Sequence, residues 1–398
     1  MTPIGARYCF AVGDAQRLSP EDQIALAREQ FEAAEDFTVA VEEEFAVLDP
    51  ESLELANRFE ELQDAAKGTA LEEHLVGELI ASEVEVRTGR CEDFADAAAA
   101  MGERRAQLFD LADSLGIALC GAGTHPWSSW KDQRIIDTPH YRRNDEILGY
   151  VVWRNNSFGI HVHTAIKGVD RAIAVNNALR NCLPELLALS ASSPFVEGVS
   201  TRLHSARTEI FTRMFPRCGV PDSFSGWDDY ERFVRFLYDT RSIDEHTQIW
   251  WSVRPHLAFP TIEVRIGDGQ PDLEEARSLA ALMHALTVRA ARAIDEGEPL
   301  PDHPHRLIEE NLWRAIRFGL GGEMIELATG RVRSTRAAVE ELIEWSLPAA
   351  EETGAASFLR VPEANAAERQ IARHDEGASL EEIYAEQVKL TRGHERVG

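Results

Sequence analysis

Cysteine is scarce in this chain of 398 residues, and the cysteines that are present form no recognisable pattern. They are odd in number and show no CxxC spacing: Cys9, Cys91, Cys120, Cys182 and Cys218. A disulfide framework needs paired cysteines, and a structural zinc site needs closely spaced ones. Neither kind of stabilisation is therefore expected.

The chain also lacks long apolar runs and an excess of positive charge. No hydrophobic stretch reaches ~18 residues and no signal-peptide pattern opens the sequence, so we expect a cytoplasmic protein. Asp and Glu number 68 against 41 Lys and Arg, a formal net charge of −27. Nucleic acids and anionic membranes are bound by concentrated basic surfaces, so neither is an expected partner. Most of the acids are expected to hydrate the surface, and a minority to serve a cation site.

Glycine motifs that bind phosphate are absent as well. The sequence contains neither GxxxxGK[ST] nor a GxGxxG after a predicted strand. If a nucleotide binds, its phosphates must be held by metals and arginines rather than by a glycine loop.

Three short segments are predicted to be β-strands with acids or histidines on one face: Val39–Val47, Gly159–Thr164 and Thr261–Ile266. Residues two apart in a strand point the same way. The pairs that share a face are Glu42 with Glu44, His161 with His163, and Glu263 with Arg265. A carboxylate-rich sheet face is costly to desolvate unless cations neutralise it, so a metal–phosphate site is the first hypothesis.

A second acidic group, made of Glu78, Glu83 and Glu85, lies between two glycines and alternates with valines at its end. Each of these segments also has a plain structural interpretation. The acids could face water, the histidines could bond backbone carbonyls in the core, and Glu263 could form a cross-strand ion pair.

Arginine is the expected ligand for phosphate or carboxylate, because its guanidinium binds either group as a fork. Besides Arg265, the candidates are Arg207, Arg254, Arg314 and Arg317. The last two are three residues apart on a predicted helix and so share a face. Taken singly, each is more commonly a surface or salt-bridge arginine.

Strands and helices do not alternate regularly along the chain. The predicted helices run from Ser19 to about Asp36 and over Phe94–Leu115, Val169–Ser190, Leu273–Ile294, Ile308–Leu320 and Ser379–Thr391. This order favours an α+β fold with a largely antiparallel sheet over a doubly wound fold. Residues 1–36 are predicted to form an N-terminal helical extension, and residues 37–398 a single catalytic domain with a helical C-terminal tail.

Taken in order, these segments resemble the carboxylate–amine ligase family of the glutamate–cysteine ligase type 2 group. The motifs that match are VAVEEEF, SEVEVRTG, GTHPW, GIHVHT, SARTEIF, WWSVRPHLAFPTIEVRIGD and ENLWRAIRFGL, from about Phe37 to about Leu320. The resemblance implies a glutamine-synthetase-like fold, in which a curved antiparallel sheet forms an active-site funnel with helices outside. It also implies that ATP phosphorylates the γ-carboxylate of glutamate and that an amine, cysteine by default, attacks the acyl phosphate.

The resemblance assigns roles to individual residues. The implied metal ligands are Glu42, Glu44, Glu78, Glu85, His161 and Glu263. The implied catalytic residues are Glu263, Arg265, Arg254 and Arg207, and the implied nucleotide-binding residues are Arg265, Arg314, Arg317 and His163. The implied cofactors are ATP and Mg²⁺, with Mn²⁺ as a substitute, and a homo-oligomer is expected.

Two segments depart from the family pattern and leave the acceptor amine open. Thr201-Arg202 stands where the family usually has Thr-Gly, and Val151–Asn156 (VVWRNN) is unlike the usual run. Two functions of other classes also stay open. One is a metallohydrolase in which His161-x-His163 binds Zn²⁺ and a carboxylate activates water. The other is a degenerate relative that binds ATP or glutamate as a sensor.

Overall fold

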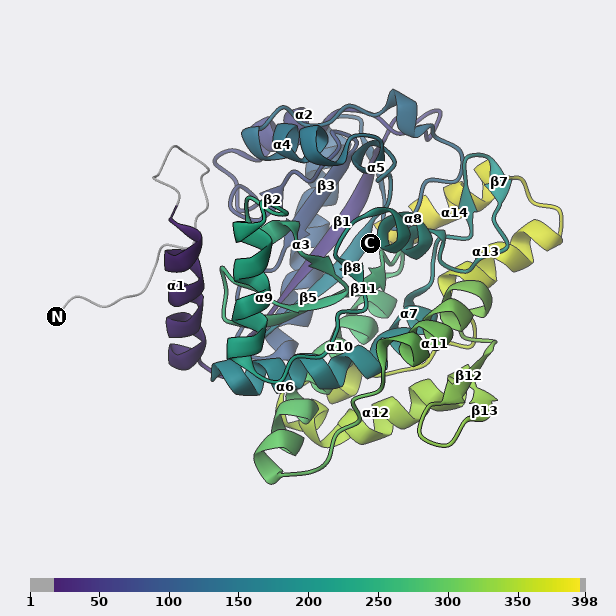
Figure 1. The fold of residues 1–398 in the computed structure, drawn as a ribbon. Coiled ribbons are helices and arrows are strands. Elements are labelled where there is room, and N and C mark those ends of the chain that lie inside the picture. The colour runs from purple at the N-terminus through teal and green to yellow at the C-terminus, as the bar shows by residue number, and fades with distance from the viewer. Residues whose placement is uncertain (1–17, 394–398) are drawn as a thin grey trace.

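A seven-stranded antiparallel sheet lies at the centre of the computed structural model, which describes residues 18–393 (Figure 1). Its strands are β1 (Val39–Leu48), β2 (Leu75–Val76), β3 (Glu83–Arg87), β4 (Ala118–Cys120), β5 (Gly159–Ala165), β10 (Val253–Pro255) and β11 (Thr261–Asp268). Their order is β10-β11-β5-β1-β3-β2, and β4 pairs with the far end of β1. The central position of β1 places its side chains between those of β3 and β5.

Short two-stranded ladders and α-helices make up most of the other regular structure in residues 18–393. The ladders are β6 (Phe195–Val196) with β7 (Val199–Ser200), β8 (Cys218–Gly219) with β9 (Trp250–Trp251), and β12 (Glu323–Glu326) with β13 (Arg331–Ser334). The helices are α1 (Pro20–Ala33), α2 (Phe59–Ala66), α3 (Phe94–Ser114), α4 (Pro139–Leu148), α5 (Tyr150–Trp153), α6 (Val169–Leu179), α7 (Leu183–Ser190), α8 (Ala206–Met214), α9 (Trp227–Asp239), α10 (Leu273–Glu296), α11 (His305–Phe318), α12 (Thr335–Glu352), α13 (Ala366–Asp375) and α14 (Leu380–Arg392). The predicted α+β class with a mainly antiparallel sheet and helices outside is confirmed.

One face of the sheet is apolar and buried against helices. Val39, Val41 and Phe45 of β1 point to this face, and α3, α6, α7 and α10 pack on the strands. Glu43 interrupts the apolar series, as the sequence shows, and the structure explains it. Its carboxylate lies 2.6 Å from Arg105 of α3, which also donates to the carbonyls of Gln270 and Pro271. Glu43 therefore forms a buried ion pair within the core.

Helix α1 packs on the outside of this body, at the left edge of Figure 1. Ser19 caps it by accepting the N–H of Asp22, and a proline follows in the first turn. Its buried face includes Phe31, whose ring lies 5.5 Å from that of Trp227 on α9. Residues 1–17 of the predicted extension lie outside the described residues, and the division into extension and catalytic domain stays a prediction.

The predicted single helix over Val169–Ser190 is wrong. The structure has two helices, α6 and α7, separated by the 3₁₀ turn Arg180–Cys182. Pro184 has no N–H to continue the helix, and the buried guanidinium of Arg180 is fixed by Asp302 at 2.7 Å and by the carbonyl of Pro221. The apolar pattern runs through both helices and therefore hides the break.

The C-terminal helices are tied to the sheet. The ring of Tyr384 on α14 lies 4.5 Å from that of His125 and 5.5 Å from that of Trp127, both in the GTHPW segment. Arg369 on α13 pairs with Glu275 on α10 at 2.7 Å. Within residues 18–393 no helix is both long and apolar enough to cross a bilayer, and the four cysteines there are free thiols.

Helix α4 connects the two edges of the sheet. Tyr141 donates to the carbonyl of Gly77, next to β2, at 2.7 Å. His140 lies 2.6 Å from Glu245, and Gln248 donates to Asn144 at 3.2 Å, close to β9 and β10. The segment α4–α5 thus lies near the polar groups of the sheet and is held from both sides.

Candidate active site

The register of four strands brings the predicted acids and histidines onto one face. Glu42 lies opposite Arg87 of β3 and His161 of β5, and Glu44 lies opposite Glu85. On the other side of β5, His163 lies opposite Glu263 of β11, which in turn lies opposite Arg254 of β10. The period of two residues in each strand therefore converts four separate segments into one polar surface.

Glu42 is the centre of this surface. Its Oε2 lies 3.4 Å from Nδ1 of His161 and 3.6 Å from Nε2 of His163, and its Oε1 lies 3.1 Å from Nε of Arg87. Burial disfavours the charged carboxylate, but the positive charges of Arg87 and His163 outweigh it and hold the pKa of Glu42 well below its usual range. Glu42 is an anion in contact with both histidines.

Glu263 is held between two guanidinium groups. Its Oε2 accepts from Nε of Arg254 at 2.7 Å, and its Oε1 accepts from Nη1 of Arg265. Burial opposes ionisation, but these two arginines keep the pKa of Glu263 well below its usual range. These contacts fit both interpretations of Glu263 made from the sequence: a cross-strand ion pair, and a residue of a metal–phosphate site.

Two groups of side chains have the spacing to hold a metal ion. The first consists of Glu42, His161 and Glu263, and the second of Glu44, Glu85 and His161. In each group the ligand atoms lie within 4.8 Å of one another. Burial, together with nearby Arg265, lowers the pKa of His161, so its ring is available as a neutral ligand.

The end of the surface near β3 carries an excess of negative charge. Partial burial and the charge of Glu44 raise the pKa of Glu78 from its ordinary 4.5 to about 7. Burial and neighbouring carboxylates raise the pKa of Glu83 and of Glu85 well above the usual range. Glu78, predicted together with Glu85, lies in the loop before β3, so the structure brings both to the surface. Arg87 pairs with Glu85, yet burial and the neighbouring carboxylates outweigh its charge.

Arg207 is positioned at the same end by small neighbours. It is the second residue of α8, and its guanidinium lies directly over Gly159, where a Cβ would come within 2.2 Å of Nη2. Asp268 lies 3.8 Å from Nη1 of Arg207 and accepts from Ser193 at 2.6 Å and from Ser205 at 2.9 Å. This buried network fixes the arginine beside Glu44, whose carboxylate accepts the N–H of Gly159.

Asp268 reaches this face because β11 contains a β-bulge. The register with β5 shifts by one residue between Val264 and Gly267. The side-chain alternation is therefore reset beyond the bulge, so an even-numbered residue there shares the face of Glu263.

Arg314 and Arg317 are not brought to this surface. Both lie on α11, where Arg314 donates to the carbonyl of Glu323 at 3.4 Å and Arg317 to that of Arg202 at 2.5 Å. Arg202 is exposed and has a left-handed backbone, with φ of 61°, a conformation that favours glycine. A nucleotide-binding role for these two arginines stays a prediction.

Two residues of the second acidic segment lie on this surface although they were given no role. Glu83, already named in that group, and Arg87 alternate with Val84 and Val86, so the signal that selected Glu85 applies equally to them. His256, whose ring lies 5.4 Å from that of His163, and Asp268 were missed for a different reason. His256 lies in a turn and Asp268 follows the bulge, so neither belongs to a simple strand periodicity.

Comparisons with known proteins identify the family of this chain. The model of the glutamate–cysteine ligase family 2 matches residues 38–391. A Rubrobacter xylanophilus protein named "Putative glutamate–cysteine ligase 2-3" is 39% identical over 330 residues, covering 83% of this chain and 89% of the relative. A Sorangium cellulosum protein named "Putative glutamate–cysteine ligase 2" is 39% identical over 342 residues, covering 84% of this chain and 91% of the relative.

Solved structures share the fold at low sequence identity. The glutamate–cysteine ligase of Francisella tularensis, crystallised with AMP, has a TM-score of 0.65 and 13% identity, with 91% of this chain and 90% of that chain covered. A bifunctional glutathione synthetase from Pasteurella multocida has a TM-score of 0.61, also at 13% identity, with 94% of this chain and 53% of that chain covered. Since the family match spans nearly the whole described chain, the protein belongs to glutamate–cysteine ligase family 2 and is an enzyme of the carboxylate–amine ligase class.

Proposed function

We propose that this ligase uses ATP and Mg²⁺ to join the γ-carboxylate of glutamate to an amine. The observation that supports this most directly is the convergence of acids from β1, β3, β11 and the loop before β3 around two histidines. Guanidinium groups lie within the same surface. Cations and polyphosphate bind where carboxylates and arginines meet in this way.

The side chains present fit a divalent cation. The two candidate groups offer mainly carboxylate oxygens, which Mg²⁺ and Mn²⁺ prefer, with one imidazole shared between them. Burial and neighbouring carboxylates raise the pKa of Glu78, Glu83 and Glu85, so ionising them together is costly unless a cation binds. Bound there, Mg²⁺ or Mn²⁺ would supply Lewis-acid neutralisation of the phosphate charge.

Two arginines have unused hydrogen-bonding capacity that fits an anion. The Nε atoms of Arg207 and Arg265 are buried and have no acceptor among residues 18–393. A buried donor without an acceptor is costly, so a phosphate or a substrate carboxylate is the expected partner. Arg254 is committed to Glu263 and to backbone carbonyls, so its expected role is to hold Glu263 in place.

The proposed reaction has two steps. A γ-carboxylate oxygen of glutamate forms a bond to the γ-phosphorus of ATP, and ADP leaves with the electron pair of the broken P–O bond. The amine nitrogen then attacks the acyl carbon, phosphate leaves with its electron pair, and the nitrogen loses a proton. Arg207 and Arg265 are proposed to orient the phosphoryl group and to stabilise the charge that develops on it. The AMP bound by the Francisella tularensis enzyme supports a nucleotide substrate here.

Cysteine is the default acceptor, because the relatives are named for it.

The hydrolase alternative needs both histidines on one zinc ion. Neither candidate metal group in the described part of the chain contains both, which favours the ligase. As the family resemblance implies, we also propose a homo-oligomer, which sedimentation velocity can test.

The decisive experiment measures ADP release with glutamate, an amine and Mg²⁺ omitted in turn. We expect release only when all three are present, and restoration by Mn²⁺ in place of Mg²⁺. Hydroxylamine serves as a small, general amine, because its product with an activated γ-carboxylate is γ-glutamyl hydroxamate. Absence of hydroxamate at saturating ATP, glutamate and Mg²⁺ would refute the proposed function.

A further inference from the structure

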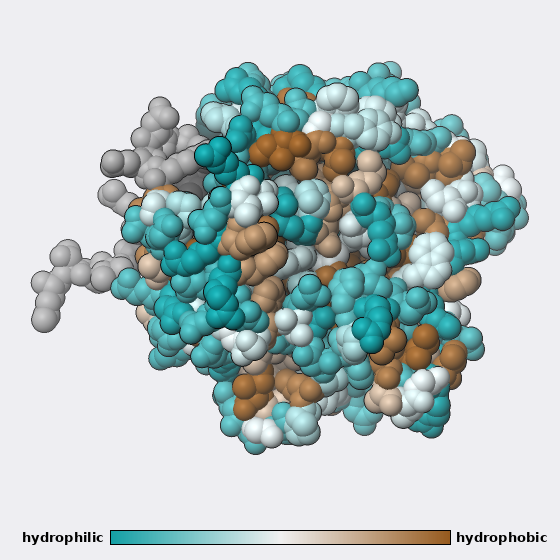
Figure 2. All heavy atoms as spheres, viewed as in Figure 1, coloured by the Kyte–Doolittle hydropathy of each residue, from teal (hydrophilic) through white to brown (hydrophobic). Residues whose placement is uncertain are grey.

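A cavity with aromatic and charged walls lies next to the acidic surface, and the chemistry proposed above does not use it. Its volume is about 340 Å³, and its lining residues are Ile80, Trp130, Lys131, Gln133, Ile135 and Trp153. Sites for small organic molecules have volumes of this order. Trp153 belongs to α5, and Figure 2 shows hydrophobic side chains gathered over the α4–α5 segment in the upper part of that face.

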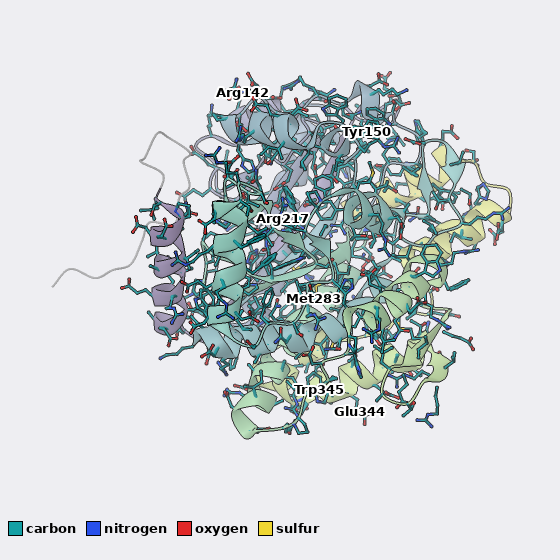
Figure 3. The ribbon with its side chains drawn as sticks, viewed as in Figure 1. Arg142, Tyr150, Arg217, Met283, Glu344 and Trp345 are labelled. Atoms are coloured by element: carbon teal, nitrogen blue, oxygen red, sulfur yellow. The ribbon has the colours of Figure 1, made fainter. Side chains whose placement is uncertain are left out.

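Aromatic rings beside the cavity are presented to solvent. The rings of Trp130 and Tyr150 are 5.4 Å apart and nearly perpendicular. Tyr150, on α5 in the upper part of Figure 3, is 53% exposed, and Trp153 is 44% exposed. Large exposed aromatic groups around a hollow are typical of a surface that binds an apolar ligand.

The cavity shares a wall with the acidic surface. Ile80 follows Glu78 by two residues, and Gln133 accepts from the hydroxyl of Ser82 at 2.5 Å. Ser82 directly precedes Glu83. One segment, residues 78–83, therefore lines the cavity and also carries two acids to the surface. A molecule in the cavity would have one end close to the proposed reaction centre.

Positive charge lies over the same rings. The ammonium of Lys131 is 5.6 Å from the centre of the Trp130 ring, and the guanidinium of Arg154 is 5.3 Å from it. Arg154 is paired with Glu197 at 2.6 Å, so Lys131 is the cation better placed for a ligand carboxylate. The side chain of cysteine is a single CH₂–SH group, which would leave most of the cavity unfilled.

We propose that this cavity binds the acceptor and that the acceptor is an aromatic α-amino acid. Its ring would lie between Trp130 and Trp153, its carboxylate near Lys131, and its amine toward residues 78–83. The inference rests on the proposed ligase function and names the acceptor for that reaction. The bond formed is the same amide bond, made with loss of phosphate and of one proton from nitrogen.

The test compares L-phenylalanine, phenethylamine and L-cysteine as acceptors in the ADP-release assay. We expect kcat/KM for phenylalanine to exceed that for cysteine by about tenfold or more. Trp153→Ala should lower kcat/KM for phenylalanine about tenfold and leave the KM of glutamate unchanged. Lys131→Met should lower kcat/KM for phenylalanine but not for phenethylamine, which has no carboxylate. The control is Phe236→Ala, an aromatic residue on α9 that is 58% exposed, which should change none of these values.

Other outcomes separate the two proposals. If hydroxylamine gives γ-glutamyl hydroxamate but cysteine is preferred and Trp153→Ala has no effect, the aromatic acceptor is refuted and the ligase function stands. If no hydroxamate forms, both fail. If Trp153→Ala changes the sedimentation coefficient and leaves acceptor kinetics intact, the rings are a contact between copies of the chain, and the proposal is overturned. Calorimetric titration of phenylalanine into wild type and Trp153→Ala gives a readout of binding that does not depend on turnover.

Discussion

Three consecutive glutamates on β1 show how strongly a single position decides the role of a side chain. Glu42 and Glu44 point to the polar surface with its histidines, whereas Glu43 points into the core and pairs with Arg105. The chemistry of the three side chains is identical. Their surroundings differ only because neighbouring residues of a strand point to opposite faces.

Glu43→Gln should destabilise the protein without removing the proposed active site. The substitution leaves the guanidinium of Arg105 buried without a counter-charge, which costs about 3–5 kcal/mol of unfolding free energy. Urea denaturation measures the loss, and activity per folded molecule should stay near that of the wild type. An unchanged urea midpoint would contradict the assignment of this pair to the core.

Glu85→Gln should lower activity and change stability little, which is the reverse of what we expect for Glu43→Gln. It removes one charge from the acidic surface without changing volume, so turnover should fall about 100-fold or more if the surface holds the cation. The Tm of the metal-free protein should change little, because the glutamine relieves repulsion from the neighbouring carboxylates but gives up the ion pair of Glu85 with Arg87. Glu381→Gln, at an exposed position on α14, is the matched control and should alter neither value. Full activity of Glu85→Gln would remove this residue from the site.

At the scale of elements, the position of Arg207 depends on where α8 begins relative to the end of β5. The guanidinium lies against Gly159, the first residue of β5, and no side chain can occupy that space. Asp268 at the end of β11 fixes the other side of the arginine. Three elements that are distant in sequence thus determine the position of one charge.

Gly159→Ala should displace Arg207 and lower kcat about tenfold or more, because a Cβ would come within 2.2 Å of Nη2. The expected cause can be isolated with a double-mutant cycle. In an Arg207→Ala background, the additional Gly159→Ala change should have little further effect on kcat. Additive losses in the double variant would show that the glycine acts by another route.

Sequence periodicity predicted which side chains of a strand share a face, but not which strands pair or in which register. The alternation in β1, β5 and the first half of β11 placed Glu42, His161 and Glu263 on one surface, and the structure agrees. Pairing partners and register are long-range properties, so the contacts of Arg207 with Gly159 and Asp268 could not be derived. The aromatic cavity could not be predicted for the same reason, because its walls come from segments that no local sequence pattern links.

For the whole molecule, the charge of the acidic surface couples stability to pH. The pKa of Glu78 is about 7 in the folded protein against an ordinary 4.5, and those of Glu83 and Glu85 are also raised. Folding therefore favours their protonated forms. The stability that Glu78 contributes is complete below pH 4.5 and is lost as the pH rises through about 7, and Glu83 and Glu85 act in the same direction.

The Tm of the metal-free protein should accordingly fall between pH 5.5 and pH 8, by on the order of 2–5 °C. Mg²⁺ or Mn²⁺ should reverse the fall at pH 8, because the cation binds the ionised carboxylates and stabilises the folded state. Thermal melts in EDTA and in Mg²⁺ across this range provide the measurement. Glu78→Gln should flatten the dependence in EDTA, and a Tm that rises with pH in EDTA would show that these carboxyls are not repelling one another.

The extra residue in β11 makes the length of that strand part of the binding chemistry. Before the bulge, odd-numbered residues such as Glu263 face the histidines, and after it the even-numbered Asp268 does. In a regular strand of the same length, Asp268 would point into the hydrocarbon interior, and Arg207 would lose the anion that fixes it. Deleting one of the bulged residues would instead leave Asp268 on the face of Glu263, because an even number of positions would then separate the two. A substitution that straightened β11 at constant length would therefore separate two halves of the proposed catalytic surface, although each half would keep its own side chains.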